Sequence, residues 1–115
     1  MSVYINKKDV IRINQEVGAT GELQNESSLD FALSILKHRK SWLYEVAALT
    51  RSILVDHAFS DGNKRTALAL ILTYLSEKDM EYDKDKMVLA VYKIAKKNIN
   101  DTNKIMRLIK NGIIR

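Results

Sequence analysis

Apolar residues recur at every third or fourth position over most of the chain, a spacing typical of amphipathic helices rather than of strands. The chain has no proline and only four glycines, so few breaks interrupt this pattern. We therefore expect an all-α fold of about six helices joined by short turns. The expected helices cover residues 7–17, 26–38, 42–56, 63–77, 86–97 and 102–111.

Several helix ends can be predicted from single residues. Asn6 is a suitable N-cap for the first helix, because its side-chain oxygen can accept a hydrogen bond from a free N–H group of the first turn. Gly18 fits the end of the same helix. By the same reasoning, Asp101 or Thr102 caps the last helix.

The composition is that of an ordinary globular protein, with 46% hydrophobic and 29% charged residues. At 115 residues the chain should form a single domain, residues 1–115. It has no cysteine, which excludes a disulfide framework and fits a reducing cytoplasm. We find no signal peptide, and the longest apolar run, residues 67–75, is far shorter than the ~20 residues of a membrane span. We expect a cytoplasmic protein without a membrane segment.

The formal charge of +5 is concentrated toward the C-terminus. From residue 84 onward, nine basic residues are opposed only by Asp85 and Asp101. We interpret this region as a solvated helical face. As a binding surface it could instead attract an acidic protein surface or nucleic acid, but the sequence contains no DNA-binding motif.

The turn at residues 57–67, His-Ala-Phe-Ser-Asp-Gly-Asn-Lys-Arg-Thr-Ala, carries the strongest chemical signal. Gly62 and Asn63 tolerate positive φ, so the loop can turn successive N–H groups inward as an anion site. The helix that begins at once points its free N–H groups and positive dipole end at the same place. Lys64 and Arg65 add full charges there. This arrangement predicts a polyanionic ligand.

Two more residues indicate a reaction on that anion. Asp61 is an acid beside two cations, which is explained if it holds a divalent metal that also binds phosphate oxygens. Histidine is the residue type suited to removing a proton from an attacking hydroxyl near neutral pH, so His57 is the candidate base. Taken singly, these residues have plainer interpretations: Gly-Asn as a simple turn, and His57 as a packed or capping histidine. Phe59 should only anchor the loop, and Ser60 has no expected role.

The loop resembles the signature of the Fic/Doc superfamily, His-x-Phe-x-Asp/Glu-Gly-Asn-x-Arg. The positions that match are His57, Phe59, Asp61, Gly62, Asn63 and Arg65. The resemblance extends over nearly the whole chain and implies a compact Fic-like helical domain. It also implies a short extended flap at residues 80–83, which could pair with the backbone of a target peptide.

Lys64, between the Asn and the Arg of the motif, makes the chain similar to Doc toxins of toxin-antitoxin pairs. That resemblance implies transfer of the γ-phosphoryl group of ATP to a hydroxyl of elongation factor Tu, which arrests translation. His57 would deprotonate the acceptor and Asp61 would bind Mg²⁺. Gly62 and Asn63 would hold phosphate oxygens, while Lys64 and Arg65 would steady the transferring group.

Two alternatives to phosphoryl transfer stay open. A Fic-type enzyme would transfer AMP to the protein hydroxyl, and a non-catalytic basic module would bind nucleic acid. The chain departs from related toxins at Ala58, where proline is common, and at Val55-Asp56, where Arg-Gly or Arg-Asn is common. The inhibitory helix motif of some Fic proteins is absent from the sequence, so a separate antitoxin protein is the expected restraint.

Overall fold

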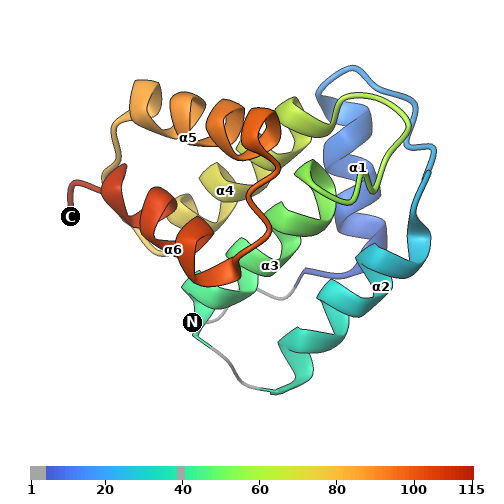
Figure 1. Cartoon of the computed structure of the whole chain (residues 1–115), viewed down its shortest axis with the longest axis horizontal. Coiled ribbons are helices and arrows are strands. Elements are labelled where there is room, and N and C mark those ends of the chain that lie inside the picture. The colour runs from blue at the N-terminus through green and yellow to red at the C-terminus, as the bar shows by residue number, and fades with distance from the viewer. Residues whose placement is uncertain (1–4, 39–40) are drawn as a thin grey trace.

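Six α-helices and one short 3-10 turn make up the computed structural model of the chain, which describes residues 5–38 and 41–115 except the side chain of Lys37 (Figure 1). The all-α prediction is therefore confirmed. The helices are α1 (Lys7–Glu16), α2 (Glu26–Ile35), α3 (Trp42–Leu54), α4 (Asn63–Glu77), α5 (Lys84–Lys97) and α6 (Thr102–Asn111), with the 3-10 turn at Leu36–His38. Within the described residues, none of these helices is long and apolar enough to cross a membrane.

Side-chain caps fix the start of five helices. The side-chain oxygen of each cap residue accepts a hydrogen bond from an N–H group of the first turn, as expected for Asn6 and for Asp101. The α5 helix begins earlier than predicted because Asp83, and not a later residue, supplies its cap. The five caps are Asn6, Asn25, Ser41, Asp83 and Asp101.

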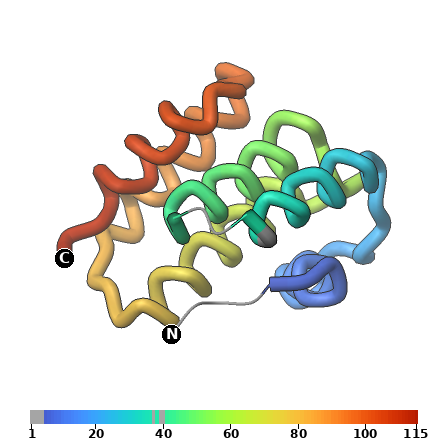
Figure 2. Tube along the Cα trace, turned by 90° about the horizontal axis from the view of Figure 1, so that it is seen from below, coloured from blue at the N-terminus to red at the C-terminus, as the bar shows by residue number. Residues whose placement is uncertain are grey.

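The α3 and α4 helices form the centre of the molecule. Figure 1 shows α1 and α2 on one side of them and α5 and α6 on the other, and Figure 2 shows the same order from below. The predicted central helix, residues 67–75, buries Ala67, Leu70, Ile71, Tyr74 and Leu75. Burial of these apolar side chains is the main favourable contribution to folding, so the turn between α3 and α4 starts and ends on rigid elements.

The connector from α1 to α2 supports this turn through backbone hydrogen bonds. A β-bridge joins Leu23 to Phe59, and the N–H group of Gln24 donates to the carbonyl of Ala58 at 2.8 Å. The N–H group of Ser60 donates to the carbonyl of Glu22 at 3.0 Å. The turn is therefore held from the side by a segment that lies about 40 residues earlier in the chain.

The flap expected at residues 80–83 is reduced to one β-bridge, between Tyr82 and Ile113. The N–H group of Glu81 donates to the carbonyl of Arg115 at 2.8 Å, so this edge pairs with the chain's own C-terminal residues. The segment also follows the C-terminal end of α4, whereas the motif loop precedes its N-terminus. A 15-residue helix, about 22 Å long, separates the two. In this structure the edge is paired with residues of the same chain, and its pairing with a target peptide stays a prediction.

Candidate active site

The α4 helix begins without a side-chain cap. Its N-cap residue is Gly62 in the left-handed conformation, with φ of +76°, and no side chain there accepts a hydrogen bond. The first intrahelical bond runs from the N–H of Thr66 to the carbonyl of Gly62 at 2.9 Å, so the N–H groups of residues 63–65 have no helical partner. The other five helices are each capped by a polar side chain.

The first turn of α4 also carries positive charge, which is unfavourable at a helix N-terminus. It contains no acidic residue, and Lys64 and Arg65, both exposed, stand where the helix dipole already favours an anion. Free N–H groups, the dipole and two cations together form a positive site, which among the described residues only the exposed carboxylate of Asp61 offsets, 4.0 Å from Arg65. An anionic ligand would satisfy these donors and these charges at once.

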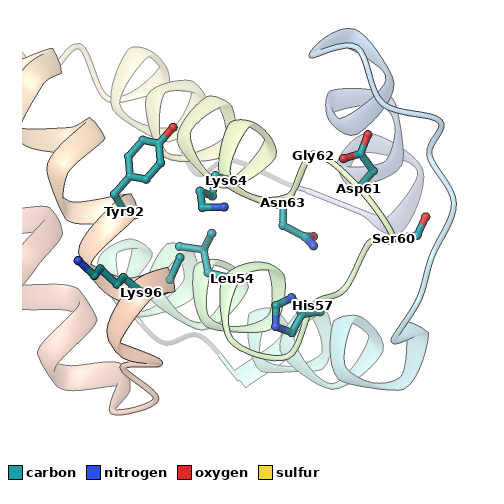
Figure 3. Close-up of a pocket in the computed structure, with 10 residues that line it drawn as sticks. Leu54, His57, Ser60, Asp61, Gly62, Asn63, Lys64, Tyr92 and Lys96 are labelled. Atoms are coloured by element: carbon teal, nitrogen blue, oxygen red, sulfur yellow. The ribbon is translucent and has the colours of Figure 1, made fainter.

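A cavity of about 550 Å³ opens beside this helix start. Figure 3 shows it between the motif loop, the first turn of α4 and one face of α5. Four of the five expected catalytic residues line it, and so do Tyr92 and Lys96, which the sequence did not single out for the site. The lining residues are Leu54, His57, Ser60, Asp61, Gly62, Asn63, Lys64, Tyr92, Ala95 and Lys96.

His57 lies at the end of the cavity formed by the loop (Figure 3). Its φ of +53° reverses the chain after α3, and the next N–H group, that of Ala58, donates to the carbonyl of Ser52 at 3.2 Å. The imidazole is exposed and makes no hydrogen bond within the described part of the chain. The plainer interpretation of a packed histidine does not hold, because the side chain is exposed. Nor does His57 cap α3, which has already ended at Leu54 with Val55 as its C-cap.

Asn63 shapes the loop through its side-chain amide. Its Oδ1 accepts a hydrogen bond from the N–H of Phe59 at 3.0 Å, and its Nδ2 donates to the carbonyl of Phe59 at 2.8 Å. Phe59 itself is 1% exposed and anchors the loop in the core, as expected. The Asn63 amide thus holds the start of α4 against the backbone of Phe59. A direct contact of Asn63 with phosphate stays a prediction.

Asn14, on α1, is a residue of this site that the sequence reasoning missed. It is fully buried, and its Nδ2 donates to the carbonyl of Asp61 and to Oγ1 of Thr66, both at 2.9 Å. Its Oδ1 accepts a hydrogen bond from the N–H of Gly21 at 2.8 Å. One side chain therefore fixes the connector, the loop and the first turn of α4. The available signal was an Asn on the apolar face of the first helix.

Asp61 and Arg65 form a loose pair at the outer side of the loop. The Asp61 carboxylate is 71% exposed, points away from His57 in Figure 3 and lies 4.0 Å from the Arg65 guanidinium. Arg65 does not line the main cavity but an adjoining hollow beside Lys64 and Tyr92. An exposed pair at this distance contributes little to stability, so a ligand can draw either side chain away at small cost.

Asp56, beside the expected base, turns away from it. Its Oδ2 accepts a hydrogen bond from the hydroxyl of Ser28 at 2.7 Å, and its carbonyl accepts one from Nδ2 of Asn25 at 3.0 Å. Its carboxylate therefore ties the end of α3 to α2. Asp56, at which the sequence departs from the expected pattern, therefore helps to attach the loop to α2.

The donor set fits a magnesium ion that arrives with phosphates. Among the described residues, no group of three or more His, Asp or Glu side chains could hold a metal by itself. Mg²⁺ bound beside a nucleotide commonly takes only one or two carboxylates, its other ligands being phosphate oxygens and water. Asp61, exposed and loosely paired, can supply that carboxylate.

Comparison with known proteins agrees with this site. The model of the Fic/DOC family matches residues 4–75, more than half of the chain and including the whole motif loop. A search of curated proteins found no match. Members of this family are typically transferases that modify proteins. The chain belongs to the Fic/DOC family.

Proposed function

We propose that the chain is a Doc-like toxin that transfers the γ-phosphoryl group of ATP to a hydroxyl of a target protein. The observation that carries this proposal is the start of α4, uncapped, without an acid and opening into the cavity that His57 lines. Phosphoryl transfer requires mainly positioning and charge stabilisation, which free N–H groups and cations supply. Lys64 in the motif favours the phosphotransferase branch of the family.

In the proposed reaction, the acceptor oxygen forms a bond to the γ-phosphorus while the bond from that phosphorus to the β,γ-bridging oxygen breaks. His57 takes the proton of the acceptor hydroxyl, and ADP leaves with the electron pair. The N–H groups of residues 63–65 and the Lys64 ammonium hold phosphate oxygens at the start of α4. Arg65 reaches the same phosphates when it leaves its loose pair with Asp61.

Asp61 would hold Mg²⁺ in this scheme, and the ion would neutralise negative charge on the phosphates. Asn63 and Asn14 act on the protein itself. The side chain of Asn63 bonds to the backbone of Phe59, and that of Asn14 fixes the carbonyl of Asp61, so the loop beside the cavity would keep its shape before a ligand arrives. Such preorganisation lowers the cost of ordering the site during the reaction.

The proposed target is a translation factor, elongation factor Tu, and the proposed location is the cytoplasm. A separate antitoxin protein is the proposed restraint, because the sequence lacks the inhibitory helix motif of self-restrained relatives. These proposals rest on family membership and on Lys64.

The test is incubation of the protein with ATP, Mg²⁺ and elongation factor Tu, followed by measurement of the intact mass of the factor. We expect a phosphoryl-sized increase that His57→Ala abolishes. The matched control is His38→Ala, which replaces the other of the two histidines, an exposed one that does not line the cavity, and should keep full activity. An adenylyl-sized increase would establish AMP transfer instead. No modification, together with salt-sensitive DNA binding unaffected by His57→Ala, would establish the nucleic-acid module.

A further inference from the structure

A second groove runs between α5 and α6, outside the proposed active site. It holds about 180 Å³, and a hollow of about 460 Å³ over α6 continues it through Leu108 and Asn111, which line both. The groove is lined by Lys86, Leu89, Ala90, Lys93, Leu108, Asn111 and Gly112. None of these residues lines the cavity beside His57.

Leu89 is the most unusual residue of this groove. It is 68% exposed, although α5 buries Met87, Val91 and Ile94 in the core with another face. Leu89 and Ala90 are separated from Lys86 and Lys93 by three or four residues, so the four side chains form one stripe along the helix. Leu89 and the half-buried Leu108 are therefore the apolar side chains of this groove that a partner could cover.

The charges around the groove have a single sign. Five cations line it and its continuation, and no acidic residue does. Within the described chain, none of the five forms an ion pair. The five are Lys86, Lys93, Lys104, Arg107 and Lys110. Their mutual repulsion would be relieved by an acidic surface laid over the groove.

We propose that this groove binds an acidic amphipathic helix of a partner protein. Aliphatic residues of that helix, spaced by three or four positions, would cover Leu89 and Leu108, and its acidic flanks would face the five cations. A nucleic acid fits the groove less well, because its phosphates gain nothing from exposed leucine and the lining contains no aromatic side chain on which a base could stack. The proposal does not depend on the reaction at His57.

The probe for this surface is a designed peptide of about 18 residues, or five helical turns, with glutamates on its flanks and leucines in one stripe. A control peptide has the same composition with the leucines dispersed around the helix. Fluorescence anisotropy with the full chain should show binding of the striped peptide about tenfold tighter than of the dispersed one. The affinity should fall as salt rises from about 50 to 200 mM.

Two pairs of surface variants separate the contributions of the groove. Leu89→Ser should weaken binding about tenfold, whereas Phe31→Ser, at a 65% exposed position on α2, should not. Lys93→Glu should weaken binding more than Lys8→Glu, which makes the same change of charge at an exposed position on α1. All four positions are exposed, so the fold should be kept, as circular dichroism would check.

Three outcomes would overturn the proposal. These are equal binding of the two peptides, equal loss in a variant and its control, or no binding of the striped peptide at about 100 μM, a concentration at which even weak protein contacts are detected. Tight binding of duplex DNA that is insensitive to Leu89→Ser would assign the surface to nucleic acid instead. None of these binding results bears on the proposed transfer reaction, which is tested separately.

Discussion

Asn14 and Thr66 share a hydrogen bond of 2.9 Å between two fully buried side chains, and this bond joins α1 to the first turn of α4. The same Asn14 amide holds the carbonyl of Asp61 and the N–H of Gly21. A buried polar group with all its bonds made fixes one geometry, whereas an unpaired one is costly. The position of the motif loop is therefore fixed from α1, by a residue about 50 positions earlier in the chain.

Replacement of Asn14 by Ala should destabilise the fold by about 1–3 kcal/mol, because it leaves the Thr66 hydroxyl and the Gly21 N–H buried without their partner. Thr66→Ser keeps the hydroxyl that accepts this bond and should cost less than Asn14→Ala. Urea unfolding measures both. If Asn14→Ala unfolded at the same urea concentration as the wild type, the hydrogen bonds of Asn14 would not be what holds the loop.

Gly62→Ala should abolish nucleotide binding and destabilise the fold. Its φ is +76°, and a Cβ atom there would lie 2.9 Å from Cβ of Ala19, so the loop must move. Gly18→Ala is a matched control: its φ is +99°, yet a Cβ atom meets nothing within 4 Å. We expect Gly18→Ala to cost about 1 kcal/mol from backbone strain and to leave ATP affinity unchanged.

Equal effects of the two glycine variants on calorimetric ATP binding would contradict a role for close packing at Gly62. The same conclusion would follow if both variants were less stable but bound ATP as the wild type does. The comparison works because the two positions share the left-handed backbone and differ in the space around it.

Asn63→Ala should lower the rate of transfer more than it lowers stability. The variant removes both hydrogen bonds to the backbone of Phe59, so the loop and the first N–H groups of α4 lose their fixed orientation. We expect a loss of about tenfold or more in kcat/KM, measured by intact mass over time. A variant with wild-type kcat/KM but a lowered unfolding midpoint would limit Asn63 to a structural role.

The stability of the chain should depend on the ionisation of Glu45. Burial raises the pKa of the Glu45 carboxyl, and the nearby Lys78 ammonium offsets this only in part. The folded state therefore binds the proton more tightly than the unfolded chain, so this contribution to stability is present at low pH and is lost as the pH rises through the folded pKa. Glu45→Gln should stabilise the fold more at about pH 8 than at about pH 4.

Glu77→Gln, at an exposed position on α4, is the control for this pH dependence and should change the free energy of unfolding by less than about 0.5 kcal/mol at either pH. Thermal unfolding at the two pH values compares the variants. A Glu45→Gln variant that is more stabilised at acid pH than at alkaline pH would contradict a raised pKa of Glu45 in the folded state.

The sequence predicted the helices and the motif loop because their signals are local. Caps such as Asn6 and Asp101 are read within one turn, and the motif lies in consecutive positions. Asn14 could not be assigned in this way, since its partners Asp61 and Thr66 lie 47 and 52 residues away. Tyr92 and Lys96 reach the cavity only because α5 packs on α4.

The surroundings of residues 80–83 could not be predicted for the same physical reason. Their partners, residues 113–115, lie about 30 positions later in the chain, and the length and direction of α4 place them at the end opposite the motif loop. The position of Arg65 was not predicted either: its guanidinium lines an adjoining hollow outside the main cavity, 4.0 Å from the carboxylate of Asp61.

The central claim is that the uncapped start of α4 binds the phosphates of ATP beside His57. The most direct test is an NMR titration of ¹⁵N-labelled protein with ATP and Mg²⁺, compared with adenosine. We predict that the backbone amides of residues 62–65 and the His57 imidazole shift with ATP and not with adenosine, since the free N–H groups would donate to phosphate oxygens that adenosine lacks. Amides of residues 62–65 that stay unshifted at saturating ATP, with shifts confined to another surface, would contradict the account.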